Sequence, residues 1–381
     1  MDSNPMLLIE SNASRFTLSE QHNAGHHESA RLRQYEIRLI RLLPRSAGNR
    51  IQCETTVVSL KDEPTYLALS YTWGAPPDSH VIEINGREVF IRENLWAFLE
   101  QASRNGLESL VWIDAICIDQ TNADERAQQI GLMEYIFTDA STVIVWLGSA
   151  DSSSDLAVQA LADCAQYIHY GFELSGFWDD PRAVAVIRLC ERAYWTRLWV
   201  FQELMLATKV TMWCGGQTVD LVTLRALIAA TMQQAELQDI QSPNAHSLLR
   251  TPAVTIMQRY SRPIDNSLWE LIMATRDLGC SVLRDKVYGL LGLVRMDPEK
   301  PIKADYTTSL YRLLNAVLKI HFQEQPPTSI ESATNDCNQL LEVFGLDSAR
   351  LSDMEDDRDV VPLPTLHDPK DCPFGEPDEP A

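Results

Sequence analysis

The stretch LVWIDAICIDQTNADERAQQIGLMEYIFTDASTVIVWLG, residues 110–148, decides the fold of this chain. Short apolar runs stand at its two ends, 110–118 and 142–147, and a helical pattern lies between them. Apolar runs of this length are typical of strands buried on both faces of a parallel sheet. Open α/β sheets bind ligands at the carboxyl ends of such strands. Asp114 and Asp119, within and at the end of the first run, are therefore predicted to lie where chemistry can occur.

The overall charge excludes two classes of partner. The chain has 381 residues, of which 45% are hydrophobic, and its formal net charge is −21. Such an excess of acids opposes a sequence-independent grip on nucleic-acid phosphates or on an anionic membrane. The sequence also has no apolar run of the length that a membrane span needs. We therefore expect no nucleic-acid partner and no membrane association.

Cysteine and histidine usage gives no sign of a metal. The eight cysteines are scattered without a C-x-x-C pair, and several lie inside apolar patterns. This is typical of reduced core cysteines in a cytosolic protein, although a disulfide framework or a zinc site is the alternative. The polar start of the chain lacks a secretory signal, and His26–His27 either bind a metal or belong to a disordered arm. We expect a cytoplasmic protein with no metal site.

Segments on both sides of the opening stretch predict further strands and helices. Residues 35–43 and 51–60 are expected to form a strand pair. Residues 81–91 contain Asn85–Gly86 between alternating residues, which predicts a hairpin. We expect Asn94 to cap a helix that ends near residue 104. Later segments predict two helices that begin at 152–154 and at Pro181, a helix over 197–207 and a strand over 209–214.

These elements predict an α/β region over 34–216, with a mainly parallel sheet and flanking helices. A boundary near 217 separates it from an α-helical region over 217–351, with helical segments near 220–238, 252–260, 266–276, 284–294 and 306–323. Residues 1–33 are expected to be a disordered arm. Residues 352–381 contain ten acids and little apolar content, so we expect a disordered acidic tail.

Two motifs supply candidate binding residues. The segment YLALSYTWG, residues 66–74, has Ser70, Tyr71 and Trp73 at the end of an apolar strand, where they can form a pocket floor. A strand end with a structural tryptophan is the alternative. Trp199 and Glu203 share one helix face, because they lie four residues apart. A carboxylate beside an aromatic ring suits a cationic or sugar-like ligand, whereas pairing of the acid with Arg197 is the structural alternative.

Asp114 lies within an apolar run and needs a partner, because burial of a lone carboxylate is costly. Arg126 or a backbone N–H is as good a partner as a functional ligand. The sequence has no G-x-G-x-x-G or G-x-x-x-x-G-K-[ST] loop, no H-E-x-x-H and no G-x-S-x-G. These absences disfavour dehydrogenases, NTPases, zinc proteases and common hydrolases.

The order of the motifs resembles a known family. YLALSYTWG, the opening stretch and YWTRLWVFQELMLA (194–207) resemble the three successive blocks of the fungal heterokaryon-incompatibility (HET) domain. LRDKVYGLLGL (283–293) and KADYTTSLYRLL (303–314) resemble segments that often follow it, although Leu283 stands where a proline is common. The resemblance implies non-self recognition between fungal cells, with programmed cell death as the output.

HET domains are in turn similar to Toll/interleukin-1 receptor (TIR) domains, which implies a flavodoxin-like core beginning near residue 66. Glu203 then corresponds to the catalytic acid of NAD-cleaving TIR domains. Its expected partners in binding substrate are Ser70, Tyr71, Trp73, Asp114, Asp119 and Trp199. An insertion over 151–194 departs from compact TIR domains and affects the placement of Glu203.

The resemblance leaves two main functions open, and a weaker third alternative is a degenerate member of the family with only a structural function. One is cleavage of NAD. In that reaction NAD is the substrate, and no cofactor is expected. The other is a non-enzymatic module that binds other incompatibility proteins or a second copy of itself.

Overall fold

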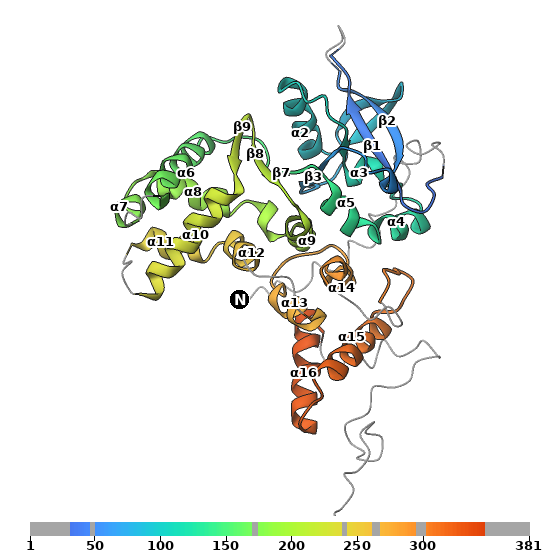
Figure 1. Ribbon diagram of the computed structural model, residues 1–381, viewed down its shortest axis with the longest axis vertical. Coiled ribbons are helices and arrows are strands. Elements are labelled where there is room, and N and C mark those ends of the chain that lie inside the picture. Colours follow the sequence, from blue (N-terminus) through green and yellow to red (C-terminus); the bar gives the residue numbers. More distant parts are fainter. Residues whose placement is uncertain are drawn as a thin grey trace, which may run out of the picture. The chain divides into compact units, whose positions relative to one another are not determined.

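The computed structural model describes residues 31–45, 50–169, 174–237, 242–260, 267–294 and 302–346 (Figure 1). The chain forms two compact units, Met1–Arg262 and Pro263–Ala381. The predicted acidic tail and all but the last three residues of the predicted N-terminal arm lie outside the described residues.

The first unit is built on one mixed sheet. Within the described residues it has nine strands, in the order β5-β4-β2-β1-β6-β3-β7-β8-β9. The strands are β1 (Glu36–Leu42), β2 (Gln52–Ser59), β3 (Leu67–Tyr71), β4 (His80–Ile84), β5 (Arg87–Ile91), β6 (Val111–Trp112), β7 (Thr142–Trp146), β8 (Val210–Cys214) and β9 (Gln217–Asp220).

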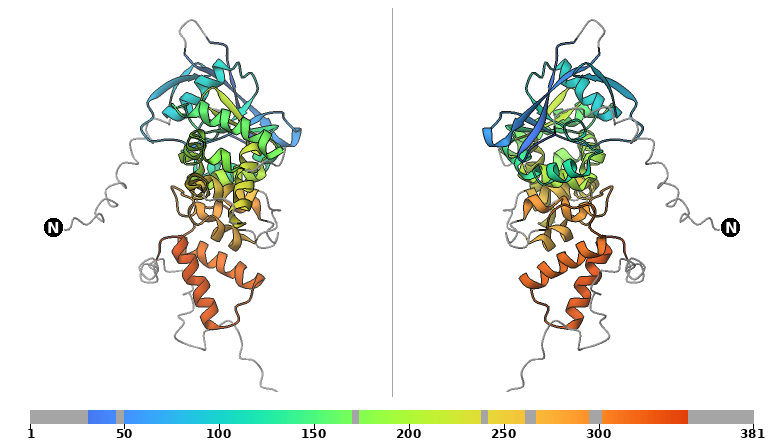
Figure 2. Two further views of the ribbon diagram at one scale, coloured as in Figure 1. Left: turned by 90° about the vertical axis from the view of Figure 1, so that its left-hand side faces the viewer. Right: turned by 90° about the vertical axis from the view of Figure 1, so that its right-hand side faces the viewer.

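The middle of the sheet is parallel, as the sequence predicted. β3 pairs in parallel with β6 and β7, and β7 pairs in parallel with β8. The pairs β1–β2, β1–β6, β4–β5 and β8–β9 are antiparallel. The expectation of a mainly parallel sheet therefore holds for the four central strands but not for the whole sheet. The four strands β5, β4, β2 and β1 enlarge the sheet on one side, and β1 and β2 form a blue antiparallel ribbon (Figure 2).

The run 110–118 was expected to be one strand, and this expectation is wrong. Only Val111–Trp112 is a strand, and the short helix α3 (Asp114–Cys117) follows at once. The backbone N–H of Cys117 donates to the carbonyl of Ile113 over 2.7 Å, which turns the chain. Ile113 and Cys117 are fully buried, so the run has the composition of a buried strand although half of it is helical.

The strand pair β1–β2 and the hairpin β4–β5 are confirmed. Asn85 and Gly86 have φ values of +51° and +78°, which a tight hairpin turn requires. The expected cap at Asn94 is wrong: α2 (Glu93–Arg104) has Arg92 at its N-cap. Asn94 lies inside the first turn, and its side chain makes tertiary contacts with Thr72 and Trp146.

Most of the helices described belong to the first unit, together with its sheet. The helices after α3 are α4 (Ala123–Ile130), α5 (Met133–Asp139), α6 (Ser154–His169), α7 (Ser175–Trp178), α8 (Arg182–Cys190), α9 (Leu198–Leu206), α10 (Leu221–Glu236), α11 (Pro243–Leu249) and α12 (Pro252–Tyr260). Helices α10 to α12 belong to the first unit, although they follow the boundary expected near 217.

The second unit is helical within its described residues. It contains α13 (Leu268–Ala274), α14 (Asp285–Tyr288), α15 (Leu310–Glu324) and α16 (Ile330–Val343). The helix predicted over 284–294 is only α14 and a short 3-10 turn, Leu291–Leu293. No helix in the described ranges of either unit has the length and apolar character needed to cross a membrane.

Candidate functional site

The candidate site begins at the carboxyl end of β3. Ser70 and Tyr71 are the last two residues of this strand, and both are buried. β3 lies between β6 and β7, so its end is surrounded by the ends of parallel neighbours. This is the edge of a parallel sheet at which ligands commonly bind. Two of the sequence-predicted residues are therefore in the expected place.

Glu203 reaches Ser70 from the apolar helix α9. Its neighbours on the helix are mostly buried, and Glu203 itself is only 6% exposed. The hydroxyl of Ser70 donates a hydrogen bond to Oε2 of Glu203. The hydroxyl oxygens of Ser70 and Tyr194 lie 2.8 Å apart. Since Ser70 has one proton to donate, Tyr194 is the donor to Ser70 whenever the carboxylate is charged.

The surroundings of Glu203 favour its protonated form. Burial raises the pKa of this carboxyl from 4.5 to about 7, while Arg197 and the hydrogen bond from Ser70 oppose the rise. The negative charge of Asp114 raises the pKa of Glu203 further. A carboxyl with such a pKa can hold or release a proton near neutral pH.

Asp114 forms the second acidic group of the site. Its Oδ2 accepts from Nε1 of Trp73 over 2.7 Å, and its Oδ1 accepts from the backbone N–H of Ala115 over 2.7 Å. The side chain of Tyr71 also hydrogen-bonds this carboxyl. Burial raises the pKa of Asp114, whereas Arg197 and these hydrogen bonds lower it. The predicted pairing of Asp114 is thus confirmed, with a backbone N–H among its partners.

Two arginines flank the acids. Arg197 donates a hydrogen bond to the carbonyl oxygen of Tyr71. Its positive charge lowers the pKa of both acids, and so it compensates part of their burial. The guanidinium carbon of Arg92 lies 5.3 Å from the ring centroid of Trp73. The site therefore combines two carboxyls, two cations, hydroxyls and an indole.

The loop that carries Trp73 is held by Asn94. The side-chain amide of Asn94 donates to the carbonyl of Thr72 over 2.6 Å and accepts from Nε1 of Trp146 over 2.9 Å. Gly74 has a φ of +78°, and a Cβ there would lie 3.3 Å from Cβ of Asn94. A glycine is required at this position by both the backbone conformation and the close approach.

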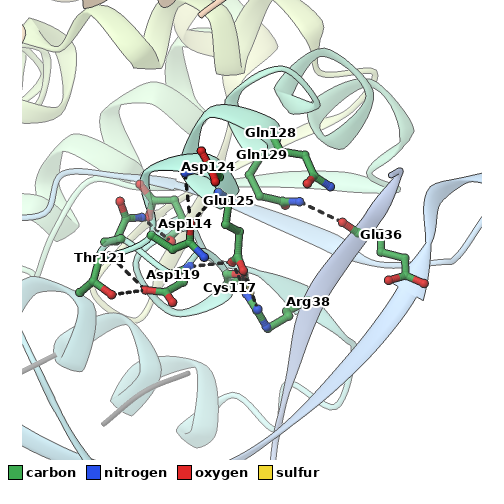
Figure 3. Close-up of polar contacts among 12 residues, drawn as sticks. Glu36, Arg38, Asp114, Cys117, Asp119, Thr121, Asp124, Glu125, Gln128 and Gln129 are labelled. Atoms are coloured by element: carbon green, nitrogen blue, oxygen red, sulfur yellow. Dashed lines mark hydrogen bonds and ion pairs between the residues drawn. The ribbon is translucent and has the colours of Figure 1, made fainter. Parts of the chain in front are cut away.

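Asp119 and Trp199 are the two candidate residues for which no hydrogen bond to Glu203 or Asp114 is described. The Oδ1 atom of Asp119 accepts from the hydroxyl of Thr121 over 2.6 Å and from its backbone N–H over 3.0 Å, in the loop before α4 (Figure 3). Trp199 is half-buried and packs against the hydrophobic core. The structure thus joins Glu203, Ser70, Tyr71, Asp114 and Trp73 in one network. Asp119 forms hydrogen bonds within its own loop, and Trp199 packs against the hydrophobic core, to which Tyr71 also belongs.

Sequence reasoning missed Tyr194 as a site residue and considered Arg197 only as a structural partner of Glu203. Both lie in the same block as Glu203, YWTRLWVFQE. Tyr194 is part of the short 3-10 helix Ala193–Thr196, and it is 2% exposed. A tyrosine in an apolar segment has no feature that distinguishes it from a core aromatic.

Ser70, Tyr71, Tyr194 and Glu203 are buried, whereas Asp114 and Trp73 are half-buried. A surface cavity of about 390 Å³ lies between α10 and α12, lined by residues such as Arg225, Met232 and Met257, and it contains none of the site residues. Across the part of the chain that the structure describes, no group of three His, Cys, Asp or Glu residues is placed to hold a metal. The two carboxyls of the network can transfer a proton or stabilise a positive charge.

Known proteins resemble the chain over this region. The heterokaryon incompatibility protein (HET) family matches residues 66–203, a range that contains the whole network. Heterokaryon incompatibility protein 6, OR allele, of Neurospora crassa is 28% identical over 336 residues, which cover 72% of this chain and 49% of that protein. The chain spans about half the length of this curated relative. No solved structure matches the chain.

Proposed function

The chain carries a heterokaryon-incompatibility (HET) domain, and from this premise we propose that it acts in fungal non-self recognition with programmed cell death as the output. The family match supports this role, and so does the relative, which is named for heterokaryon incompatibility. We place this activity in the cytoplasm. The proposed partners are other incompatibility proteins or a second copy of the chain, and neither nucleic acid nor membrane.

The proposed chemistry is cleavage of the N-glycosidic bond of NAD in a TIR-like site. The observation that carries it is Glu203, a buried carboxyl held by Ser70 at the carboxyl end of a parallel strand. Glycosidic cleavage passes through a state in which the sugar carries positive charge. A carboxylate fixed in a poorly hydrated place stabilises that charge strongly. Nicotinamide is already a good leaving group, so the reaction has little need of a second acid.

The burial of Glu203 gives this proposal a specific requirement. A side chain that is 6% exposed cannot touch a substrate unless its cover moves. We therefore propose that the isolated chain is inactive or slow, and that assembly opens the site. We propose that the loop of Trp73 is the element that moves. This loop follows β3 directly, and the hydrogen bond from Trp73 to Asp114 would break when it opens.

NAD loss by the full chain, free and after forced oligomerisation through a fused assembly tag, tests the proposal. Glu203→Gln keeps the size of the side chain and removes its charge, so NAD loss should slow roughly 100-fold or more. Glu134→Gln, on α5, is the control and should leave turnover unchanged. Wild-type protein that consumes no NAD in either state would contradict the enzymatic proposal.

The second function is a non-enzymatic interaction module. The closed surroundings of Glu203 favour it, because a buried network can serve to fix the shape of a binding surface. In that case Glu203→Gln should abolish neither partner binding nor cell death, provided that the variant folds. A cell-death assay in a fungal host, run beside the NAD assay, separates the two functions.

A further inference from the structure

A buried ion pair joins β1 to α4 beside the candidate site (Figure 3). The side chains of Arg38 and Glu125 are 2% and 8% exposed. The two carboxylate oxygens of Glu125 lie 2.5 and 2.9 Å from the two terminal nitrogens of Arg38. Such a two-point contact fixes the orientation of both groups.

The same pair also binds the backbone between α3 and α4. Nη1 of Arg38 donates to the carbonyl oxygen of Cys117 over 2.9 Å. The backbone N–H of Asp119 donates to Oε1 of Glu125 over 2.8 Å. The ion pair therefore holds the chain just before and just after Ile118, and this short segment has a fixed path between β1 and α4.

The held segment reaches the candidate site through Gln120. The side-chain amide of Gln120 donates to the carbonyl oxygen of Asp114 over 3.0 Å. Asp114 in turn accepts from the indole N–H of Trp73. Hydrogen bonds and the covalent chain of residues 117–120 and 114 thus connect Arg38 on β1 to Trp73 on the loop after β3.

We propose that Arg38 and Glu125 are positioning residues, which fix the segment 117–120 and thereby the place of Asp114 against Trp73. Net stability is a poor explanation for the pair, because an apolar pair of similar volume is often as stable as a buried ion pair. The backbone contacts are what an apolar pair cannot supply. The consequence for NAD cleavage rests on the proposed function, whereas the placement of Asp114 does not.

The double variant Arg38→Met/Glu125→Leu tests this role in the full chain. It removes both charges together, so no unpaired charge is left buried. Hydrogen exchange at the Asp119 amide reports on the segment. The indole ¹⁵N–¹H resonance of Trp73, assigned with Trp73→Phe, reports on the contact with Asp114. Arg45→Met/Glu100→Gln, which removes a half-buried ion pair elsewhere, is the matched control.

The double variant should melt within about 5 °C of the wild type, while exchange at Asp119 accelerates at least roughly tenfold. The Trp73 resonance should shift or broaden, and the control should change neither signal. Unchanged exchange and an unchanged Trp73 resonance in a folded double variant would overturn the proposal. If the double variant does not fold, Arg38→Lys replaces it. This change keeps the charge but loses the two-point contact, and the same two signals decide.

Discussion

Ser70 donates its hydroxyl hydrogen bond to Glu203, a residue 133 positions later in the chain. The contact joins the end of a central strand to a helix that follows the 151–194 insertion. Since both side chains are buried, neither can exchange its partner for water. The bond therefore links the stability of the first unit to the protonation of Glu203.

The first prediction concerns the pH dependence of stability. Folding raises the pKa of Glu203 from 4.5 to about 7, so the folded state binds a proton that the unfolded chain has lost. This stabilising contribution is complete below pH 4.5 and disappears as the pH rises through about 7, with an upper bound of about 3 kcal/mol. Glu203→Gln should therefore flatten the fall in melting temperature over this range. Equal pH profiles for the two proteins would contradict the prediction.

Ser70→Ala should destabilise the first unit. The change leaves the Tyr194 hydroxyl and the Glu203 carboxyl without their shared partner in a buried place. The expected cost is about 1–3 kcal/mol, measured by thermal or urea unfolding. Ser109→Ala, at an exposed position in the loop before β6, provides a comparison that should change stability much less. A Ser70→Ala protein as stable as the wild type would show that the hydroxyl contacts contribute little.

Trp73→Phe should raise the pKa of Asp114. The variant keeps an aromatic ring but loses the indole donor, whose hydrogen bond favours the charged carboxylate. Titration of the Asp114 carboxyl by ¹³C NMR measures the change. Trp96→Phe is the control, because that ring stacks on His80 outside the network. An Asp114 pKa that is equal in all three proteins is the outcome that counts against this assignment.

The fourth prediction concerns the N-terminal limit of the folding unit. A chain that begins at residue 31 should fold, whereas one that begins at 66, where the family match starts, should not. β1 pairs with both β2 and β6, and Ile37, Leu39 and Ile40 are fully buried. The shorter chain would expose that apolar surface. Circular dichroism and melting temperature distinguish the two, and a cooperative transition in the shorter chain would refute the prediction.

The sequence predicted the elements whose local pattern is unambiguous. β7 and β8 are short apolar runs, and the Asn85–Gly86 turn has few alternatives to a hairpin. The helix α3 was missed because Ile116 and Cys117 are buried in the same way whether the backbone is extended or helical. The local sequence pattern therefore could not distinguish an extended from a helical backbone over residues 114–117.

The site was predictable only in part, for a related reason. Ser70, Asp114 and Glu203 are polar residues in apolar surroundings, and that contrast is visible in the sequence. Tyr194 has no such contrast, so its contact with Ser70 depends on tertiary structure alone. Asn94 was taken for a helix cap because its partners, Thr72 just after β3 and Trp146 at the end of β7, are brought together only by the pairing of these two strands.

The position of β3 in the sheet has a consequence for biosynthesis. The ribosome makes β3 before either of its neighbours, because β6 and β7 follow it in the chain. Until β6 has left the exit tunnel, both edges of the strand that carries Ser70 have unpaired backbone groups, and the edge that pairs with β7 stays unpaired until Trp146 has emerged. Unpaired edges recruit other strands, so the nascent chain is exposed to misassembly during this interval. Translation speed through residues 72–146 should therefore influence the yield of native protein.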